Sequence, residues 1–505
     1  MIQFGIETEY GITRTGAEDL DVVAESIALV RATTARGARM KWDYAPEDPH
    51  ADARGFKVDE LRQDHDEAGY VEQDSRRTLT FAEIKSDLAL VNGGRFYNDH
   101  AHPEYCTPEC STVDEVVAHD RAGERIVGEA ARRLSERNGS EVRIYKNNTD
   151  FRGHSYGCHE NYLLPRSLPW RDLARGVQAF LVTRQIFCGA GKFGVEEEDR
   201  FVGTEFQISQ RADFFTELQS VDTMQKRPLV NTRDEPHALA EKWRRFHVIL
   251  GDANMSPFAT GLKLGTMALV LELLAREPRC RLPIVAAPLE SLRAVSRDSR
   301  WKWELELEGG APTTAIEVQR EYLERVKSVC DLSAPDRVAS VRDWETVLRD
   351  LERDPRICRD RLDWVAKHEL IAEFAEGEGV SPDDPWLRSL DLEYHRIDPE
   401  VGLYFALEDG GMMRGRPREE SVAAACERPP ETTRAAIRGR CIEKFGDRIR
   451  VAQWDHVVLA GDQYDIKISL LDLFAPEELA RYRAALEAAA TPDELRQLLR
   501  KGDRI

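Results

Sequence analysis

Two glutamates stand two residues apart near the N-terminus, in the segment FGIETEY. On a β-strand alternate side chains share a face, so Glu7 and Glu9 would project into one space about 6.6 Å apart. Their neighbours Phe4, Ile6 and Thr8 would line the opposite side, which reads as the core side. The pattern allows either a solvated outer face or an inward-facing pair of carboxylates. The glycines that flank the pair favour the second interpretation, because something approaches the backbone closely there.

The same alternation of polar, ligand-type residues recurs in three other segments: Arg95, Tyr97 and Asp99, followed by Glu104, in RFYNDHAHPEY; His159 and Asn161 in CHENY; and Arg233, Glu235 and His237 in NTRDEPHA. One such strand usually has a wet outer face, but four of them indicate a sheet surface lined with oxygen and imidazole donors. Carboxylates with a few histidines suit Mg²⁺ or Mn²⁺, and these ions commonly bridge to phosphate oxygens. The residues therefore allow a Mg-nucleotide site, with solvated strand faces as the alternative.

A zinc site is a competing interpretation of the segment HAHPEYCTPEC. His100, His102, Cys106 and Cys110 could be drawn as ligands, but the run lacks the usual Cys-x₂-Cys knuckle and a second cluster. We expect the two cysteines to be ordinary semi-buried thiols. The glycine-rich GAGKFG does not match a phosphate-binding Walker loop, because no Ser or Thr follows Lys192.

Size and composition narrow the class of protein. The chain has 505 residues, 42% hydrophobic and 32% charged, which allows two or three domains with a sizeable core. The net charge of -20 argues against non-specific nucleic-acid binding and against an anionic membrane surface. We see no signal peptide, and the most apolar run, Met267 to Ala275, is too short to span a bilayer. With nine scattered cysteines, the expected location is the reducing cytoplasm.

The elements that must position these residues follow from periodicity and capping signals. Helices are expected at 22–36, 112–137, 181–189, 239–249, 262–276 and across much of 317–376. Thr112 and Glu115 form a capping-box pair at the start of the second. Strands fall mainly in the first half and do not alternate strictly with helices. This order predicts an α+β fold with an antiparallel or mixed sheet.

Two boundaries divide the chain. A polar, acidic segment of about 41–80 has few periodic apolar positions, and a loop of that length is either functional or disordered. Pro429 and Pro430 mark a linker. We therefore expect a large domain over 1–428, which contains the insertion at 41–80, and a small C-terminal domain over 431–505.

Together the motifs GIETEYG, the Arg95 strand leading into HPEY, KNNTD, SYGCHENY, VTRQ, NTRDEPHA and HVILGDANMS resemble the Pup ligase/depupylase family. That family is related to glutamine synthetase and to γ-glutamyl-cysteine ligases. The resemblance runs from Gly5 to about Asp462, nearly the whole chain. It implies a curved, largely antiparallel sheet cradle packed with helices, as in glutamine synthetase, plus a small C-terminal domain.

The family has two branches, and the resemblance implies one of them. Ligases attach the small protein Pup, through its C-terminal glutamate, to substrate lysines. The other branch deamidates the C-terminal glutamine of Pup and cleaves Pup from modified proteins. A long insertion between the first helix and the strand of the catalytic aspartate is typical of this depupylase branch, and 41–80 matches it. A Pup–protein ligase that carries a long loop remains the alternative.

The resemblance also implies the ligands, ATP and Mg²⁺, and the residues that contact them. The implied metal shell is Glu7, Glu9, Tyr97, Glu104, His159, Glu235 and His237. The implied ATP contacts are Gly5, Ile6, Glu7, Thr8, Glu9, Arg95, Thr107, Asn161, Arg434, Arg438 and Trp454. For Arg434 and Arg438, a solvated basic helix face is an equally good explanation.

Asp99 is the residue expected to act on the bond. The bond is the γ-amide of a glutamine or an isopeptide of the same type. A carboxylate near cations remains ionised, so Asp99 could serve as a base toward water or attack the carbonyl itself. The partners are Pup and pupylated proteins, with no nucleic acid and no membrane. Because Pup-family modifiers are acidic, Arg211, Arg227 and Arg233 are candidate docking residues, with ordinary salt bridges as the alternative.

Overall fold

The computed structural model describes residues 2–17, 19–62, 77–197, 200–381, 384–415 and 417–501. The stretch 63–76 of the expected insertion lies outside these ranges. A seven-stranded sheet with the order β15-β10-β1-β8-β7-β6-β3 lies at the centre of the fold, and every neighbouring pair in it is antiparallel. Its strands are β1 Phe4–Glu9, β3 Gly37–Arg39, β6 Leu88–Leu90, β7 Arg95–Asp99, β8 His102–Cys106, β10 Cys158–Pro165 and β15 Trp243–Val248.

The remaining strands form small two- or three-stranded sheets. They are β2 Gly11–Arg14, β4 Ala51–Asp52, β5 Phe56–Lys57, β9 Val142–Tyr145, β11 Lys192–Glu197, β12 Arg200–Gln207, β13 Phe215–Ser220, β14 Arg227–Asn231, β16 Glu304–Glu306, β17 Pro312–Thr314, β18 Ile449–Ala452, β19 His456–Ala460 and β20 Asp465–Ser469. Only the β13–β14 pair among the described ladders is parallel. The predicted α+β class with a largely antiparallel sheet is confirmed.

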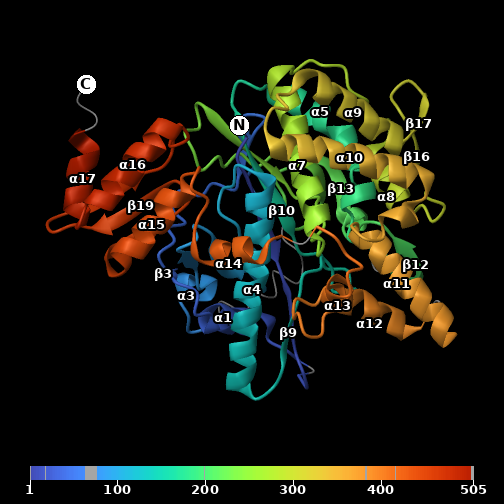
Figure 1. Cartoon of the computed structure of the whole chain (residues 1–505), viewed down its shortest axis with the longest axis horizontal. Helices are drawn as coiled ribbons and strands as arrows, with labels where there is room; N and C mark the ends of the chain where they lie inside the picture. Colours follow the sequence, from blue (N-terminus) through green and yellow to red (C-terminus); the bar gives the residue numbers. More distant parts are fainter. Residues whose placement is uncertain are drawn as a thin grey trace.

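Helices cover the sheet and build most of the second half of the chain. They are α1 Val22–Ala32, α3 Phe81–Lys85, α4 Val113–Asn138, α5 Trp170–Thr183, α6 Gln185–Cys188, α7 Pro257–Arg276, α8 Pro288–Arg297, α9 Ala315–Val329, α10 Pro335–Arg353, α11 Asp363–Glu378, α12 Pro385–Tyr394, α13 Leu403–Asp409, α14 Glu419–Glu427, α15 Ala435–Phe445, α16 Pro476–Ala488 and α17 Pro492–Lys501. In Figure 1, α5, α7, α9 and α10 lie together, while α15, α16 and α17 lie at the opposite end of the molecule.

The first strand has the alternation that its sequence predicts. Phe4, Ile6 and Thr8 are buried on one face of β1, where α4 packs, and Glu7 and Glu9 are only partly buried on the other. Burying the apolar face fixes the register, because a slip by one residue would send both glutamates into the core. The hydrophobic residues of β1 therefore determine which of its side chains face the core and which face away from it.

Helix α4 begins and ends where its sequence signals place it. Thr112 accepts from the backbone of Glu115, the Glu115 side chain accepts from the backbone of Thr112, and Gly139 ends the helix in the left-handed region at φ 66°. These contacts satisfy backbone groups that have no partner inside the helix. The helix holds β1 and β8 from the core side.

One predicted helix is wrong. Residues 239–249 form no helix; a turn at 240–242 leads into the edge strand β15, which pairs with β10 from Glu160↔Val248 to Pro165↔Trp243. Apolar residues in this stretch fit a helical spacing, but pairing with β10 buries Arg244, Phe246 and Val248 on one face. Long-range pairing overrides the local pattern here.

The C-terminal elements pack on the far edge of the main sheet. Helix α15, the sheet β18-β19-β20, α16 and α17 enclose a core that includes Ile437, Leu459 and Leu486. Ala38 of β3 and Ala89 of β6 belong to the same core. The division into domains at 428 and 431 stays a prediction.

Among the described residues one helix, α7, is long and apolar enough by composition to cross a membrane. It contains the apolar run noted above, and 83% of its apolar window is buried inside the protein. It packs against α4, α5, α6, α9 and α10.

Candidate active site

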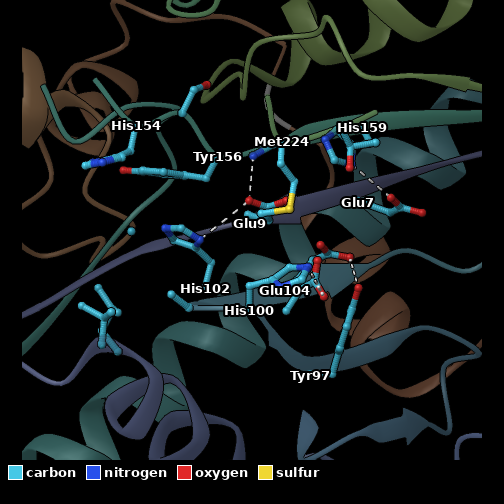
Figure 2. Close-up of a pocket in the computed structure, with 18 of the residues that line it drawn as sticks. Glu7, Glu9, Tyr97, His100, His102, Glu104, His154, Tyr156, His159 and Met224 are labelled. Atoms are coloured by element: carbon cyan, nitrogen blue, oxygen red, sulfur yellow. Dashed lines mark hydrogen bonds and ion pairs between the residues drawn. The ribbon is translucent and has the colours of Figure 1, made fainter. Parts of the chain in front are cut away.

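A cavity of about 1060 Å³ opens on the polar face of the central strands. The sequence-predicted residues that line it are Glu7, Glu9, Arg95, Tyr97, Asp99, Glu104, His159, Arg211, Arg227, Arg233, Glu235, His237 and Trp454. Figure 2 shows Glu7 beside His159, and Glu9 beside His102. The sheet register explains the first of these contacts, because Glu7 pairs with His159 across β1 and β10. The register also places Glu9 opposite Glu104 across β1 and β8.

One group of donors consists of Glu7, His159 and His247, each with a ligand atom within 4.8 Å of the others. Asn161 donates to Glu7 over 2.9 Å, and Arg245 lies 3.8 Å from it. Burial by itself would raise the pKa of Glu7, but His159 and Arg245 hold it below its usual value. Burial and Arg245 lower the pKa of His247 well below that of a free histidine, so this imidazole is neutral and can act as a ligand.

A second group consists of Glu9, Asp99 and Glu104, again within 4.8 Å. Burial, followed by the charges of Asp99 and Glu7, raises the pKa of Glu104 well above its usual value. Tyr97 donates to Glu104 over 2.9 Å and Cys106 donates to it over 3.0 Å, while Gly157 N–H donates to Glu9 over 2.8 Å. Three carboxylates crowded without an equal positive charge provide the oxygen donors that Mg²⁺ or Mn²⁺ prefers.

The donor sets therefore fit divalent cations, and they differ from the predicted shell: Asp99 belongs to the second group, and further differences concern His247, Glu235 and His237. His247 joins the first group although the sequence placed it in a helix. Glu235 accepts from Asp48 N–H over 2.7 Å and lies 3.5 Å from Arg245, so protein groups already pair it. His237 lies in the cavity wall but outside both groups, and burial, with Arg245 and Arg434, lowers its pKa to about 3. A ligand role for Glu235, His237 and Tyr97 stays a prediction.

The carboxylate of Asp99 lies next to a positively charged side chain of the protein itself, Lys85. Lys85, the last residue of α3, donates to Asp99 over 2.7 Å. Burial by itself would raise the pKa of Asp99, but Lys85 and His100 hold it well below the usual range. The carboxylate expected to act on the bond is therefore ionised and accepts hydrogen bonds rather than donating them.

A second hollow of about 90 Å³ adjoins the large cavity, where β1 meets the C-terminal elements. Its lining includes the predicted nucleotide contacts Gly5, Ile6, Glu7, Thr107, Asn161, Arg434 and Trp454. Thr8 differs, because its side chain is buried on the core side of β1 and can offer a nucleotide only backbone atoms. ATP contact by these residues stays a prediction.

The close approach indicated by the flanking glycines is made by the protein itself. A Cβ at Gly5 would stand 3.1 Å from Thr107 Oγ1, and one at Gly11 would stand 2.7 Å from the Tyr156 hydroxyl. The Thr107 hydroxyl also accepts from Ile6 N–H over 3.0 Å. Glycine at these positions leaves room for the side chains of Thr107 and Tyr156 to pack against the backbone of Gly5 and Gly11.

Arg434 and Arg438 do not form a solvated helix face. Both are buried, and both bind the carboxylate of Glu109, Arg434 Nε over 2.7 Å and Arg438 Nη2 over 2.5 Å. Arg438 also lies 4.7 Å from the Trp454 ring and donates to Gly93 O, so it stands behind the hollow rather than in its wall. The pair anchors α15 to the segment that follows β8.

The three candidate docking arginines line the large cavity. Arg211 donates to Ile249 O over 2.6 Å and Arg227 donates to Ser155 O over 2.8 Å, so both are held by backbone carbonyls rather than by surface salt bridges. Arg233 lies 4.0 Å from Glu235 and pairs through its backbone with Asp52 of the insertion. The segment of Arg233, NTRDEPHA, leaves β14 after Asn231 and continues as a loop, not as the strand that alternation predicts. Their role toward Pup stays a prediction.

Sequence reasoning missed His247, Arg245, Lys85 and the insertion residues Trp42 and Tyr44. The first two alternate along β15, and the polar–apolar alternation of Arg245, Phe246, His247 and Val248 was the available signal. No sequence signal pointed to the other three.

Solved structures show the class to which this fold belongs. The complex between Pup and its ligase PafA matches with a TM-score of 0.76 at 28% identity, over 99% of this chain and 92% of that one. PafA in complex with ADP matches with a TM-score of 0.72 at 30% identity, over 88% and 95%. The fold is that of the Pup ligases.

Sequence comparison shows to which protein family the chain belongs. Residues 3–458 match the family described as Pup-ligase protein. A depupylase from Acidothermus cellulolyticus is 44% identical over 468 residues, 90% of each chain, and a Pup deamidase/depupylase from Mycobacterium tuberculosis is 39% identical over 477 residues, 91% of each. A Pup–protein ligase from Acidimicrobium ferrooxidans is 39% identical over 414 residues, 80% of this chain. The chain belongs to the Pup ligase/depupylase family.

Proposed function

We propose that this protein is an ATP- and Mg²⁺-dependent hydrolase that deamidates the C-terminal glutamine of Pup and cleaves the isopeptide bond between Pup and substrate lysines. The observation that carries the proposal is an ionised Asp99 between the carboxylate group and Lys85, inside a cavity large enough for a chain terminus. Such a carboxylate can attack or activate water toward an amide carbonyl.

The relatives support hydrolysis rather than ligation. Those described as depupylases match about 90% of this chain, whereas those described as ligases match 77–80% of it. The insertion is the other support, because residues 41–62 of it supply Tyr44, Glu47 and Leu61 to the cavity wall. A ligase relative was crystallised with Pup and another with ADP, so we extend Pup, pupylated proteins and adenine nucleotide to this chain.

The chain's own residues account for the reaction as follows. Arg211, Arg227 and Arg233 attract the acidic Pup terminus into the cavity. Asp99 then takes a proton from water as the water attacks the γ-carbonyl, or it attacks that carbon itself and leaves an anhydride for water to open. Either route consumes one water and releases ammonia from glutamine or a lysine amine from the isopeptide.

Glu7, His159 and His247, together with Glu9 and Glu104, would hold the divalent cations. A bound cation would offset the carboxylate charge and polarise the reacting carbonyl. Hydrogen bonds from Asn161 to the partly buried Glu7 and from Tyr97 to the buried Glu104 keep these donors fixed. Arg245 adds a positive charge next to Glu7. The nucleotide would lie beneath Trp454 and extend from the small hollow into the large cavity, which Arg95 and Trp454 both line.

Ammonia release tests this function. Pup ending in glutamine, incubated with the protein and ATP, should release ammonia, and no release with any nucleotide would refute the proposal. Asp99→Asn should abolish release while it leaves nucleotide affinity intact. Asp462→Asn, an exposed carboxylate in the C-terminal part with 72% of its side chain accessible, is the matched control and should behave as the unmodified protein.

The same assay separates the ligase alternative. A ligase would form ADP in step with a Pup–lysine conjugate and would release no ammonia. A non-hydrolysable ATP analogue sharpens the distinction, because a hydrolase that keeps its nucleotide as a cofactor would still turn over.

We also propose a cytoplasmic location. All nine cysteines lie in the described ranges, and every one is a free thiol. Such cysteine usage suits a reducing compartment.

A further inference from the structure

The guanidinium of Arg95 is held by residues from two distant parts of the chain. Its central carbon lies 3.6 Å from the centroid of the Tyr97 ring, two residues along β7, and 3.9 Å from the centroid of the Trp42 ring in the insertion. Arginine stacks favourably on aromatic rings. Arg95 is 6% exposed, and it still lines the large cavity.

A second set of contacts fixes the same group from its edge. Arg95 donates through Nε and Nη2 to one oxygen of Asp87, over 2.8 and 2.5 Å, and through Nη2 to the Tyr44 hydroxyl. Tyr44 in turn donates to the other Asp87 oxygen over 2.9 Å. We call Trp42, Tyr44, Asp87 and Tyr97 the Arg95 clamp. Two of its four members belong to the insertion.

Trp42 also reaches the C-terminal elements. Its ring meets the ring of Trp454 edge to face, with centroids 5.3 Å apart and an angle of 77°. The backbone supports this contact, because Ala452 N–H donates to Lys41 O over 2.9 Å, and the Gln453 side chain donates to Asp43 O. Trp454 lines both hollows, whereas Trp42 lines neither. Trp42 therefore touches two cavity residues from behind.

We propose that Trp42 and Tyr44 are positioning residues of the nucleotide site, which act by holding Arg95 and Trp454 in the orientation that receives ATP. The inference rests on the nucleotide binding assigned above. It makes the first residues of the insertion a supporting wall of that site, whatever the remainder of the insertion does.

The physical reason is preorganisation. An arginine has many rotamers, and ordering it at the moment of binding lowers affinity. Stacking on two rings and the Asp87 contacts fix Arg95 during folding instead. A cation–π contact in a desolvated place is worth enough that losing the Trp42 face should weaken nucleotide binding by about tenfold.

The test measures the affinity of the full-length protein for MgADP and MgATP by calorimetry. Trp42→Ala should raise Kd by about tenfold, and Trp42→Phe, which keeps an aromatic face, should restore most of the affinity. Phe56→Ala is the matched control, since Phe56 is an aromatic of the same insertion, 49% exposed, that stacks on Arg54 and not on Arg95. It should bind as the unmodified protein.

A double-mutant cycle distinguishes positioning from a general loss of structure. In an Arg95→Met, Trp454→Phe background, Trp42→Ala should weaken nucleotide binding far less than it does alone, because the groups through which it acts are gone. An undiminished effect in that background, or unchanged affinity of Trp42→Ala by itself, would overturn the proposal.

Two further measurements test the proposal if Trp42→Ala cannot be studied, and check the contact between the two tryptophans. If Trp42→Ala fails to fold, Tyr44→Phe, which removes one hydroxyl, takes its place and should also raise Kd; unchanged affinity then overturns the proposal. The Trp42–Trp454 pair should give a near-UV circular dichroism signal that Trp42→Phe reduces. Failure of the unmodified protein to bind nucleotide would instead refute the proposed function.

Discussion

Lys85 Nζ lies 2.7 Å from a carboxylate oxygen of Asp99. Both groups are largely buried, with 13% and 24% of their side chains exposed. The contact exists because α3 ends at Lys85, where Ser86 turns into the left-handed region at φ 49°. The chain thus places an ammonium ion beside the carboxylate that would act on a lysine-derived amide.

Replacing this cation should move the pH profile. In Lys85→Met the pKa of Asp99 rises toward its usual value, so the acidic limb of the pH profile for kcat/KM of ammonia release should shift to higher pH by about one unit. Lys242→Met, which removes an exposed partner of Asp472, is the control and should leave the profile in place. Identical limbs in both variants would mean that Lys85 does not govern Asp99.

The same pair makes a stability prediction whose sign follows from the lowered pKa. A carboxylate whose folded pKa is depressed stabilises the fold above its unfolded pKa of about 4, and the stabilisation disappears as pH falls through the folded value. Urea unfolding of Lys85→Met should therefore show a deficit against the unmodified protein at pH 7 that closes at strongly acidic pH. A deficit independent of pH would point to lost packing.

His247 tests the first donor group. His247→Ala should weaken binding of Mn²⁺ by about 10- to 100-fold, measured by the electron paramagnetic resonance of free Mn²⁺, because one of three ligands is lost. His368→Ala, in α11 and outside both groups, should bind as before. Equal affinity in the two variants would remove His247 from the ligand set.

The variant Glu104→Gln tests the second donor group, because it removes a carboxylate charge with little change in side-chain shape. With no divalent cation present, Glu104→Gln should unfold at an equal or higher urea concentration than the unmodified protein, because burial and neighbouring carboxylates disfavour its charge. Adding Mg²⁺ should then stabilise the unmodified protein more than the variant. The same Mg²⁺-induced gain in both would show that the second donor group holds no cation.

Glu160 lies on the core face of β10, opposite to the face that carries His159. It lies in β10 between His159 and Asn161, yet it faces the core, where Arg184 and Tyr162 bind it over 2.5 and 2.6 Å. Arg184→Met should reduce the free energy of unfolding by about 3–5 kcal/mol, since it leaves a buried carboxylate unpaired. Nucleotide affinity of the remaining folded protein should not change.

Local signals predicted most elements and the faces of β1, β7 and β10. The alternation that brings Glu7 opposite His159 is a property of single strands, and the caps of α4 depend on residues three or four apart. The residues of these strands that line the large cavity were therefore among those predicted from the sequence. The predicted site was incomplete where β15 was taken for a helix, because the pairing that overrides the local pattern comes from β10.

The contact between Trp42 and Arg95 could not have been foreseen in this way. These residues are far apart in the chain, and nothing in the composition of the polar insertion marks one tryptophan as a partner of a strand arginine. Likewise Arg434 and Arg438 have helical spacing that suits solvent equally well, but tertiary partners, among them the Glu109 carboxylate, bury them. Tertiary contacts determine whether such residues are buried or exposed, and a single sequence does not reveal those contacts.

The core that Ala38 and Ala89 share with the C-terminal elements has a consequence for how the chain can be cut. A protein ended at Pro429 and Pro430 would uncover apolar side chains of Val91 and its neighbours together with the hydrogen-bonding edge of β3. An uncovered strand edge recruits other chains. We therefore expect such a fragment to self-associate instead of serving as a minimal enzyme.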